Sequence, residues 1–69
     1  MNVKGTTNKA KSARLRLGLT QQALGYRSRT SAADVSRIEN GRALPYPGQA
    51  KRIARVLNLR PEELQQPED

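Results

Sequence analysis

The side chains best able to form specific polar contacts lie between Thr20 and Arg42, and the long polar ones are mainly amides and arginines. Guanidinium and amide groups form directed, often paired hydrogen bonds with phosphates and with the edges of nucleic-acid bases. The chain has no histidine and no cysteine, and only six acidic residues. Four of those acids lie in the last nine residues, so no catalytic triad, metal site or carboxylate pair can be assembled. These residues predict a binding protein rather than an enzyme, with no cofactor and no metal.

The charge is unevenly distributed along the 69 residues. The formal net charge is +7, with 13 Lys and Arg, and the isoelectric point is near 10.9. Up to Arg60 the only acids are Asp34 and Glu39, whereas residues 61–69 are acidic. Such a basic body suits a polyanion, and nucleic acid is the commonest one, although many small proteins are basic without a specific partner. No stretch resembles a signal peptide, a spanning helix or a membrane-surface helix, so we expect a cytoplasmic protein, associated with the nucleoid and without a membrane partner.

The elements that must position these side chains are predicted to be helices. Aromatic residues make up only 3% of the chain, so Leu, Ile, Val and Ala must form the core, which favours an all-α fold. Thr20 and Ser31 are good N-caps only eleven residues apart, which predicts two short helices joined by a tight turn. We expect one compact five-helix domain over residues 9–65, with a flexible arm at 1–8 and an acidic tail at 66–69. The predicted helices span about 9–17, 21–27, 32–40, 47–57 and 61–65.

Two charged residues interrupt apolar stripes. Arg14 shares a helix face with Ala10, Ala13 and Leu17, and Glu39 shares one with Val35 and Ile38. An unpaired buried charge costs several kcal/mol, roughly, so a partner is needed unless the side chains extend to solvent. The simpler hypothesis is that Arg14 and Glu39 form an ion pair across the core.

These features together resemble the lambda-repressor and Cro type (XRE-like) of helix-turn-helix domain. The most specific segments are the Leu-Thr-Gln start at residues 19–21, the Ser-x-Ile-Glu-x-Gly end at 36–41 and the Ile-Ala-x-x-Leu helix at 53–57. The resemblance runs without a gap from Arg14 to Leu64. It implies a five-helix fold in which residues at the positions of Arg14 and Glu39 commonly form a buried ion pair.

The resemblance also implies a function, a sequence-specific transcriptional regulator of double-stranded DNA and most simply a repressor. In such domains the second helix of the motif enters the major groove while the first crosses the backbone. The predicted base-reading residues are Arg37, with Ala32, Ala33 and Ser36. The predicted phosphate contacts are Gln21, Gln22, Arg27, Arg29, Asn40 and Arg42. Asp34 is expected to cap its own helix rather than accept a hydrogen bond from cytosine.

Two positions depart from the family pattern. The usual turn glycine is Arg29 here, and a frequent alanine in the first helix of the motif is Gly25. Because arginine is unfavourable in a left-handed conformation, the sequence leaves open whether the turn keeps the usual path or takes another. Glycine in the helix interior suggests that a neighbouring helix approaches closely.

The sequence leaves open whether the protein dimerises, and it leaves two alternative functions, a protein-interaction role and RNA binding. Members of this family usually bind as dimers on two half-sites, and the candidate surface is the loop 43–47 together with the segment 59–64. The same domain type also serves in antitoxins, which bind a toxin, and in coactivators that bridge other proteins. RNA binding is a weaker alternative, because single-stranded RNA is generally bound by stacking on aromatic residues and this chain has only two tyrosines.

Overall fold

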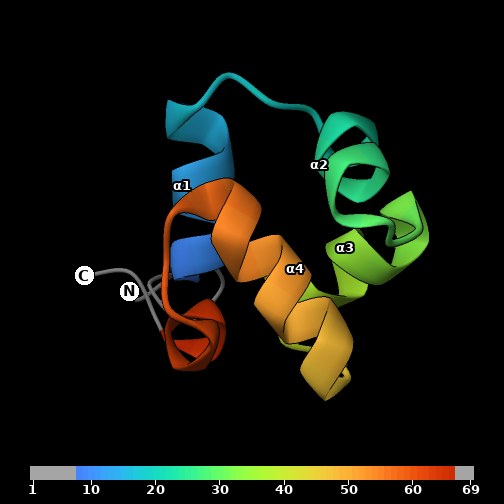
Figure 1. Cartoon of the computed structure of the whole chain (residues 1–69), viewed down its shortest axis with the longest axis vertical. Helices are drawn as coiled ribbons and strands as arrows, with labels where there is room; N and C mark the ends of the chain where they lie inside the picture. The colour runs from blue at the N-terminus through green and yellow to red at the C-terminus, as the bar shows by residue number, and fades with distance from the viewer. Residues whose placement is uncertain (1–7, 67–69) are drawn as a thin grey trace.

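A computed structural model describes residues 8–66 of the chain, and in that range it contains helices and no β-sheet (Figure 1). Four of the helices are α-helical, and a short 3-10 helix follows them. The elements, in chain order, are α1 (Lys9–Arg16), α2 (Gln21–Ser28), α3 (Ala32–Glu39), α4 (Pro47–Leu57) and η2 (Pro61–Gln65).

The helices begin where the sequence supplies capping side chains. Asn8, Thr20 and Ser31 each accept a hydrogen bond from a backbone N–H in the first turn of α1, α2 and α3 respectively. These bonds satisfy N–H groups that have no partner within the helix. The side chain of Gln49 caps α4 differently, because its Oε1 accepts from the backbone N–H of Tyr46 at 3.0 Å. Each helix start is thus fixed by residues close to it in the sequence.

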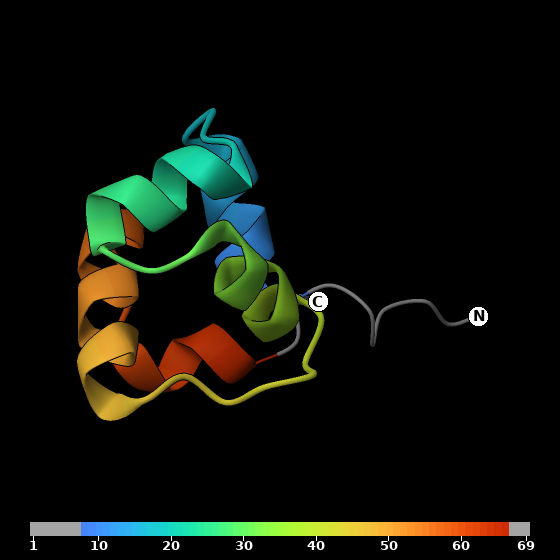
Figure 2. The same cartoon turned by 90° about the vertical axis from the view of Figure 1, so that its right-hand side faces the viewer.

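The core is small and entirely aliphatic among the described residues. α1, α2 and α4 surround it with the inward side of α3, and η2 closes the bottom beneath α1 and α4 (Figures 1 and 2). Every buried side-chain polar atom in this part of the chain has a hydrogen-bond partner. The buried apolar residues are Ala10, Ala13, Leu24, Val35, Ile38, Ile53, Ala54, Leu57 and Leu64.

The fifth predicted helix has the predicted bounds but not the predicted geometry. Residues 61–65 form a 3-10 helix, so the five-α-helix expectation is wrong in this element. The segment is only five residues long, and Gln66, which precedes a proline, has φ −79° and ψ 140°. A residue before proline disfavours the α conformation, so the helix cannot extend. The backbone N–H of Arg60 donates to Glu63 at 2.8 Å and holds the pKa of that carboxyl below its usual value.

The domain also extends one residue further at each end than predicted. Asn8, expected in the flexible arm, is instead buried, caps α1 and donates its Nδ2 to the carbonyl of Ile38 at 2.9 Å. Gln66, expected in the acidic tail, accepts at its carbonyl from the backbone N–H of Lys9 at 2.9 Å. The rest of the predicted arm and tail, 1–7 and 67–69, lies outside the described residues.

The structure settles the path of the turn between α2 and α3. Arg29 adopts the left-handed conformation, with φ 55° and ψ 46°, so of the two paths left open by the sequence the turn takes the usual one. The backbone N–H of Thr30 donates to the carbonyl of Gly25 at 2.8 Å, which closes the end of α2 in the manner of a Schellman turn. The turn is therefore the one that normally uses glycine, formed here with arginine.

Gly25 is explained by the close approach of the same turn and of the first residue of α3, Ala32. A Cβ atom built on Gly25 would lie 2.4 Å from the carbonyl oxygen of Thr30 and 3.3 Å from the backbone nitrogen of Ala32. Backbone atoms this close cannot move aside as the end of a side chain can. The expectation of a close approach is correct, but the approaching group is the chain a few residues downstream.

Candidate nucleic-acid interface

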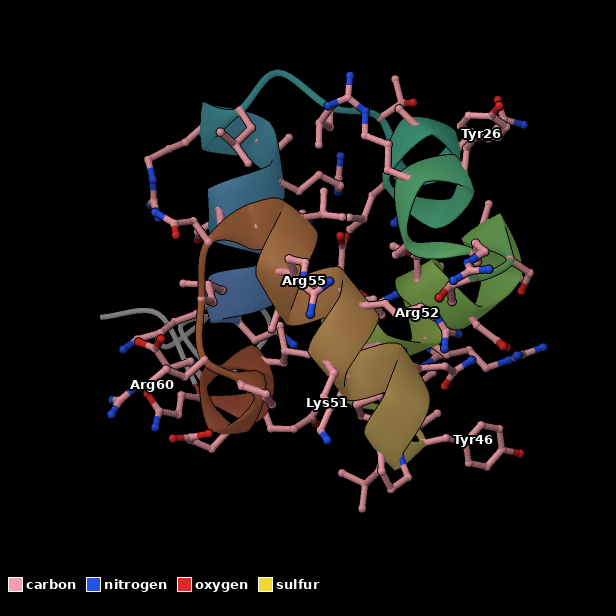
Figure 3. The ribbon with its side chains drawn as sticks, in the orientation of Figure 1. Tyr26, Tyr46, Lys51, Arg52, Arg55 and Arg60 are labelled. Carbon is pink, nitrogen blue, oxygen red and sulfur yellow. The ribbon has the colours of Figure 1, made fainter. Side chains whose placement is uncertain are left out.

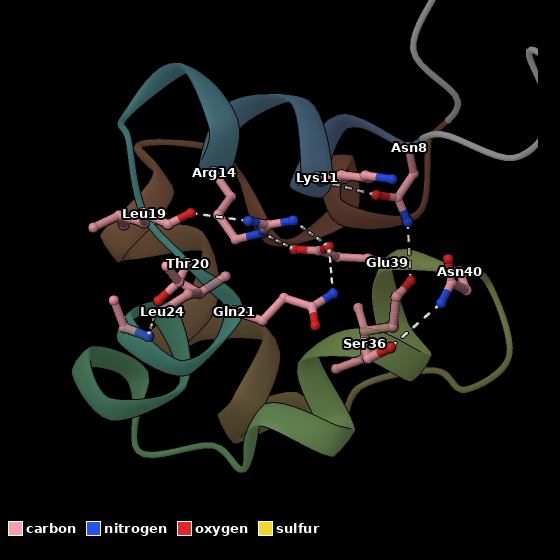
Figure 4. A network of polar contacts seen from close by, with 12 residues as sticks. Asn8, Lys11, Arg14, Leu19, Thr20, Gln21, Leu24, Ser36, Glu39 and Asn40 are labelled. Carbon is pink, nitrogen blue, oxygen red and sulfur yellow. Dashed lines mark hydrogen bonds and ion pairs between the residues drawn. The ribbon is translucent and has the colours of Figure 1, made fainter.

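A buried ion pair fixes α3 against α1 (Figure 4). The guanidinium of Arg14 donates from Nε to Glu39 Oε2 at 2.6 Å and from Nη2 to Glu39 Oε1 at 3.1 Å. Its Nη1 also donates to the carbonyl of Leu19, in the connection to α2, at 2.9 Å. The two side chains are 9% and 2% exposed, so this pair is shielded from solvent and salt. A single arginine therefore joins α1, the α1–α2 connection and α3.

Gln21 belongs to this network, although it was predicted to contact phosphate. Its Nε2 donates to Glu39 Oε1 at 3.1 Å, and the side chain is half-buried. One of the two N–H donors of its amide is thus engaged within the fold, while the backbone N–H at the start of α2 is also able to contact an anion. No local pattern in the sequence indicates this bond, because residues 21 and 39 lie on different elements.

The outward face of α3 carries most of the predicted base-reading residues. Ala33 and Arg37 are exposed and lie four positions apart, so one stands above the other on the side opposite Val35. Ser36 is half-buried on the flank of this face, and its hydroxyl accepts from Asn40 Nδ2 at 3.4 Å. Ala32 is half-buried near the turn, further from the outward direction. The structure therefore brings Ala33, Ser36, Arg37 and Asn40 onto one surface of α3.

Asp34 was predicted to cap its own helix, and its side chain does not do so. Among the described residues its carboxylate accepts from Arg37 Nη1 at 2.6 Å and from Gln49 Nε2 at 3.2 Å. Ser31 does cap α3, but only through its own hydroxyl, which accepts from the Asp34 backbone. The three-residue spacing from Asp34 to Arg37 could have revealed the ion pair. The bond to Gln49 has no such local signal.

The remaining predicted phosphate contacts lie on different sides of the molecule. Gln22 is exposed on the flank of α2 that borders Gly25, which faces α3. Arg27 lies five positions later, a rotation of about 140°, and is exposed on the other flank. Arg29 and Arg42 are exposed at the two ends of α3. By its position on α2, Arg27 therefore points away from the side on which Gly25 meets α3.

Arg52 is a residue that sequence reasoning missed. From α4 it donates Nε to the carbonyl of Ser28 at 2.7 Å and Nη2 to the carbonyl of Arg29 at 3.4 Å. These carbonyls lie at the C-terminal end of α2, where no N–H group of the same helix is available to them. Figure 3 shows the side chain on the α3 side of α4, unlike Lys51 and Arg55. Arg52 thus supports the left-handed turn from a position 23 and 24 residues away.

The loop between α3 and α4 exposes apolar surface beside Arg37. Leu44 and Tyr46 are 78% and 73% exposed. They border a shallow pocket of about 170 Å³ between α3 and the start of α4, which Asp34, Arg37 and Gln49 also line. The sequence suggested this loop as half of a dimer surface. The structure places the apolar side chains there, and whether they meet a second copy stays a prediction.

Neither a metal site nor a membrane-spanning element is found in the described part of the chain. No three acidic, histidine or cysteine side chains within residues 8–66 are grouped so that they could hold a metal ion. No helix in that range has the length and apolar character needed to cross a bilayer.

Comparison with known proteins agrees with this architecture. Residues 9–66 match the family described as "Helix-turn-helix domain". The chain therefore belongs to the helix-turn-helix domain family. The match is consistent with the lambda-repressor and Cro type of pattern seen in the sequence. No curated protein matches the chain. No solved structure matches it.

Proposed function

We propose that this protein is a sequence-specific regulator of transcription that binds double-stranded DNA through α3, most simply as a repressor. The observation that carries the proposal is the contrast between the two faces of α3. Its inner face is held by Val35, Ile38 and the ion pair of Glu39, whereas its outer face presents Ala33 and Arg37 to solvent. A rigid helix whose exposed outer face carries an arginine fits the major groove.

The proposed contacts follow from the chemistry of each side chain. Arg37 binds a guanine through its O6 and N7 atoms, a contact worth about 1 to 3 kcal/mol of discrimination. Ala33 and Ala32 contact a thymine methyl group, and Ser36 binds a base or a phosphate. The phosphate contacts are assigned to the backbone N–H of Gln21 and to Gln22, Arg29, Asn40 and Arg42. Arg27 is left out because of its place on α2.

Repression is the simplest mode of action for a domain of this kind. The described residues form a single folded unit, and such a unit can block polymerase by occupying a promoter. One α3 reads only a few base pairs, and two copies on half-sites about 34 Å apart would read a useful operator. We propose that DNA brings the two copies together, with Leu44 and Tyr46 near the contact. The proposed contacts are hydrogen bonds, ion pairs and apolar contacts, so the protein acts as a non-enzymatic binder that needs no cofactor.

The experiment is selection from a random duplex pool, followed by titration of the enriched duplex at several salt concentrations. We expect an enriched motif and an affinity that falls steeply with salt. Arg37→Ala should remove the preference at one base pair. Arg42→Ala should weaken binding to all sequences and reduce the salt slope by about 1. The proposal fails if no motif is enriched, and the assignment of Arg37 fails if both variants lose affinity uniformly.

A second candidate function is a protein-interaction module, either an antitoxin or a coactivator. The exposed Leu44 and Tyr46 favour it, since apolar side chains grouped at a pocket suit a protein partner. A stable complex with one protein, lost in Leu44→Ser/Tyr46→Ser without loss of DNA binding, would support this role. RNA binding is less favoured, because Tyr26 and Tyr46 lie beside different helices (Figure 3) and offer no shared stacking platform.

A further inference from the structure

We propose that Asp34 determines the DNA specificity of this protein by fixing the guanidinium of Arg37 in the orientation that reads a base. The inference rests on the proposed function, and in particular on Arg37 as the base-reading residue. Asp34 itself contacts no DNA in this proposal. It acts through Arg37 and is therefore a positioning residue.

The first support is the chain of hydrogen bonds that reaches Arg37 from the scaffold. Asp34 Oδ1 accepts from Arg37 Nη1 at 2.6 Å, and Asp34 Oδ2 accepts from Gln49 Nε2 at 3.2 Å. Gln49 is in turn fixed by the backbone N–H of Tyr46, at the start of α4. The carboxylate is thus bonded on both oxygens, and it ties a surface arginine to two helices. A lone exposed i,i+3 pair would lack this second anchor.

The second support is the part of the guanidinium that stays available. A guanidinium has five N–H donors in a planar fork. In the described structure Asp34 takes one from Nη1, and Nε and Nη2 of Arg37 make no other hydrogen bond there. The Arg37 side chain is 55% exposed. The Nε–Nη2 edge therefore remains free for the O6 and N7 atoms of a guanine, with its plane set by the carboxylate.

The third support is electrostatic. Asp34 and Glu39 are the only acids before residue 61, and Glu39 is buried in its ion pair. Asp34 is accordingly the one acidic side chain with appreciable exposure on α1–α4, at 37%. A carboxylate beside the groove repels phosphates and holds Arg37 away from them, which weakens binding to every sequence. A correct guanine offsets this repulsion through the bidentate contact, so discrimination increases.

The test measures the dissociation constants of Asp34→Ala and Asp34→Asn on two duplexes. One is the selected duplex, and the other has the guanine pair assigned to Arg37 replaced. The wild type should prefer the first roughly 5- to 150-fold, the range for one bidentate contact. In Asp34→Ala this preference should fall below about 3-fold, while affinity for the replaced duplex rises. Asp34→Asn, which keeps an acceptor for Arg37 but removes the charge, should lie between the two.

Two controls separate positioning from charge and from folding. Glu62→Ala removes an exposed acid of η2 that pairs with Arg60 and belongs to none of the proposed DNA contacts, and it should leave the preference unchanged. In an Arg37→Ala background, Asp34→Ala should change both affinities by the same factor. Thermal melts followed by circular dichroism establish whether each variant is folded. If Asp34→Ala is unfolded, the test uses Asp34→Asn, whose side chain has nearly the same shape as that of the wild type.

The outcomes distinguish this inference from the proposed function. If Asp34→Ala and Asp34→Asn bind both duplexes more tightly by the same factor, the preference for the selected duplex is preserved. That result would overturn the role of Asp34 and leave the DNA-binding proposal intact. A wild-type protein that shows no preference between any duplexes would overturn both. A preference that Asp34→Ala reduces when Arg37 is present, and leaves unchanged in the Arg37→Ala background, would support the inference.

Discussion

At the residue scale, Arg14 and Glu39 show what a sequence can reveal about a site. Each interrupts an otherwise apolar stripe, and a buried charge must be paired, so the ion pair could be inferred from the sequence alone. The bond of Gln21 to Glu39 and the bond of Asp34 to Gln49 could not be inferred in this way. Both side chains bond across elements, Gln21 to α3 and Asp34 to α4, and the helix faces alone do not specify which polar groups meet.

Replacing Glu39 with glutamine leaves the guanidinium of Arg14 buried without a counter-charge. We expect Glu39→Gln to lower the free energy of unfolding by about 3 to 5 kcal/mol, and Arg14→Met to have a comparable effect. The double variant should be more stable than the sum of the two changes predicts, with a coupling of about 2 kcal/mol or more. Urea denaturation followed by far-UV circular dichroism measures this.

The exposed pair of Asp34 and Arg37 is the control, and its coupling in the same assay should stay below about 1 kcal/mol. A coupling near zero between Arg14 and Glu39 would contradict a structural role for their bond. If either single variant is unfolded, recovery of the helical signal in the double variant gives the same answer.

At the element scale, the helices were predictable and the turn between α2 and α3 was not. Caps and apolar stripes placed all four α-helices to within one residue at each end, because those signals are local. The geometry of the turn depends on Gly25, Arg29 and Arg52 together, and the last lies on α4. The sequence shows that Gly25 and Arg29 are both unusual for this motif. How the two residues fit one turn can be seen only from the path of the backbone in three dimensions.

The turn makes opposite predictions for its two unusual residues. Gly25→Ala should lower the free energy of unfolding by about 1 to 3 kcal/mol, because the new Cβ would press on the Thr30 carbonyl. Arg29→Gly should raise it by up to about 1 kcal/mol, since relief of the left-handed arginine exceeds the added freedom of the unfolded chain. Thermal and urea unfolding measure both.

Gly48→Ala is the matched control for the first of these. Gly48 also lies in a helix, but the closest atom to its added Cβ is the movable end of the Arg52 side chain, at 3.2 Å. This variant should unfold within about 1 kcal/mol of the wild type. Equal losses in Gly25→Ala and Gly48→Ala would show that the clash with Thr30 has no special cost.

At the scale of the whole molecule, the positive charge lies on more than one surface. One group of basic residues lies on α3 or at its ends, namely Arg29, Arg37 and Arg42. A second group, Lys51 and Arg55, lies on the outer face of α4, on the side away from Arg52 (Figure 3). The sequence predicted a polyanion partner from the total charge, but it could not say which surface the polyanion meets. The proposed function assigns it to α3.

Removing equal charge from each surface tests that assignment. Arg29→Gly/Arg42→Ala should reduce the slope of log affinity against log salt by about 1.8, because two phosphate contacts are lost. Lys51→Ala/Arg55→Ala removes the same charge from the outer face of α4 and should leave the slope within about 0.5 of the wild type. Equal reductions in the two variants would indicate that DNA is attracted by overall charge rather than bound at α3.

The pairing of Gly25 with Arg29 also constrains the order in which this sequence can change over generations. A lineage that moves toward the alanine and glycine typical of these two positions has to replace Arg29 first. Glycine at 29 widens the backbone conformations open to the turn, and the Thr30 carbonyl can then withdraw from a side chain at 25. The opposite order passes through an alanine that clashes with the turn while arginine still strains it. Because natural proteins lie only a little above the stability that they need, we expect the route that replaces Gly25 first to be disfavoured.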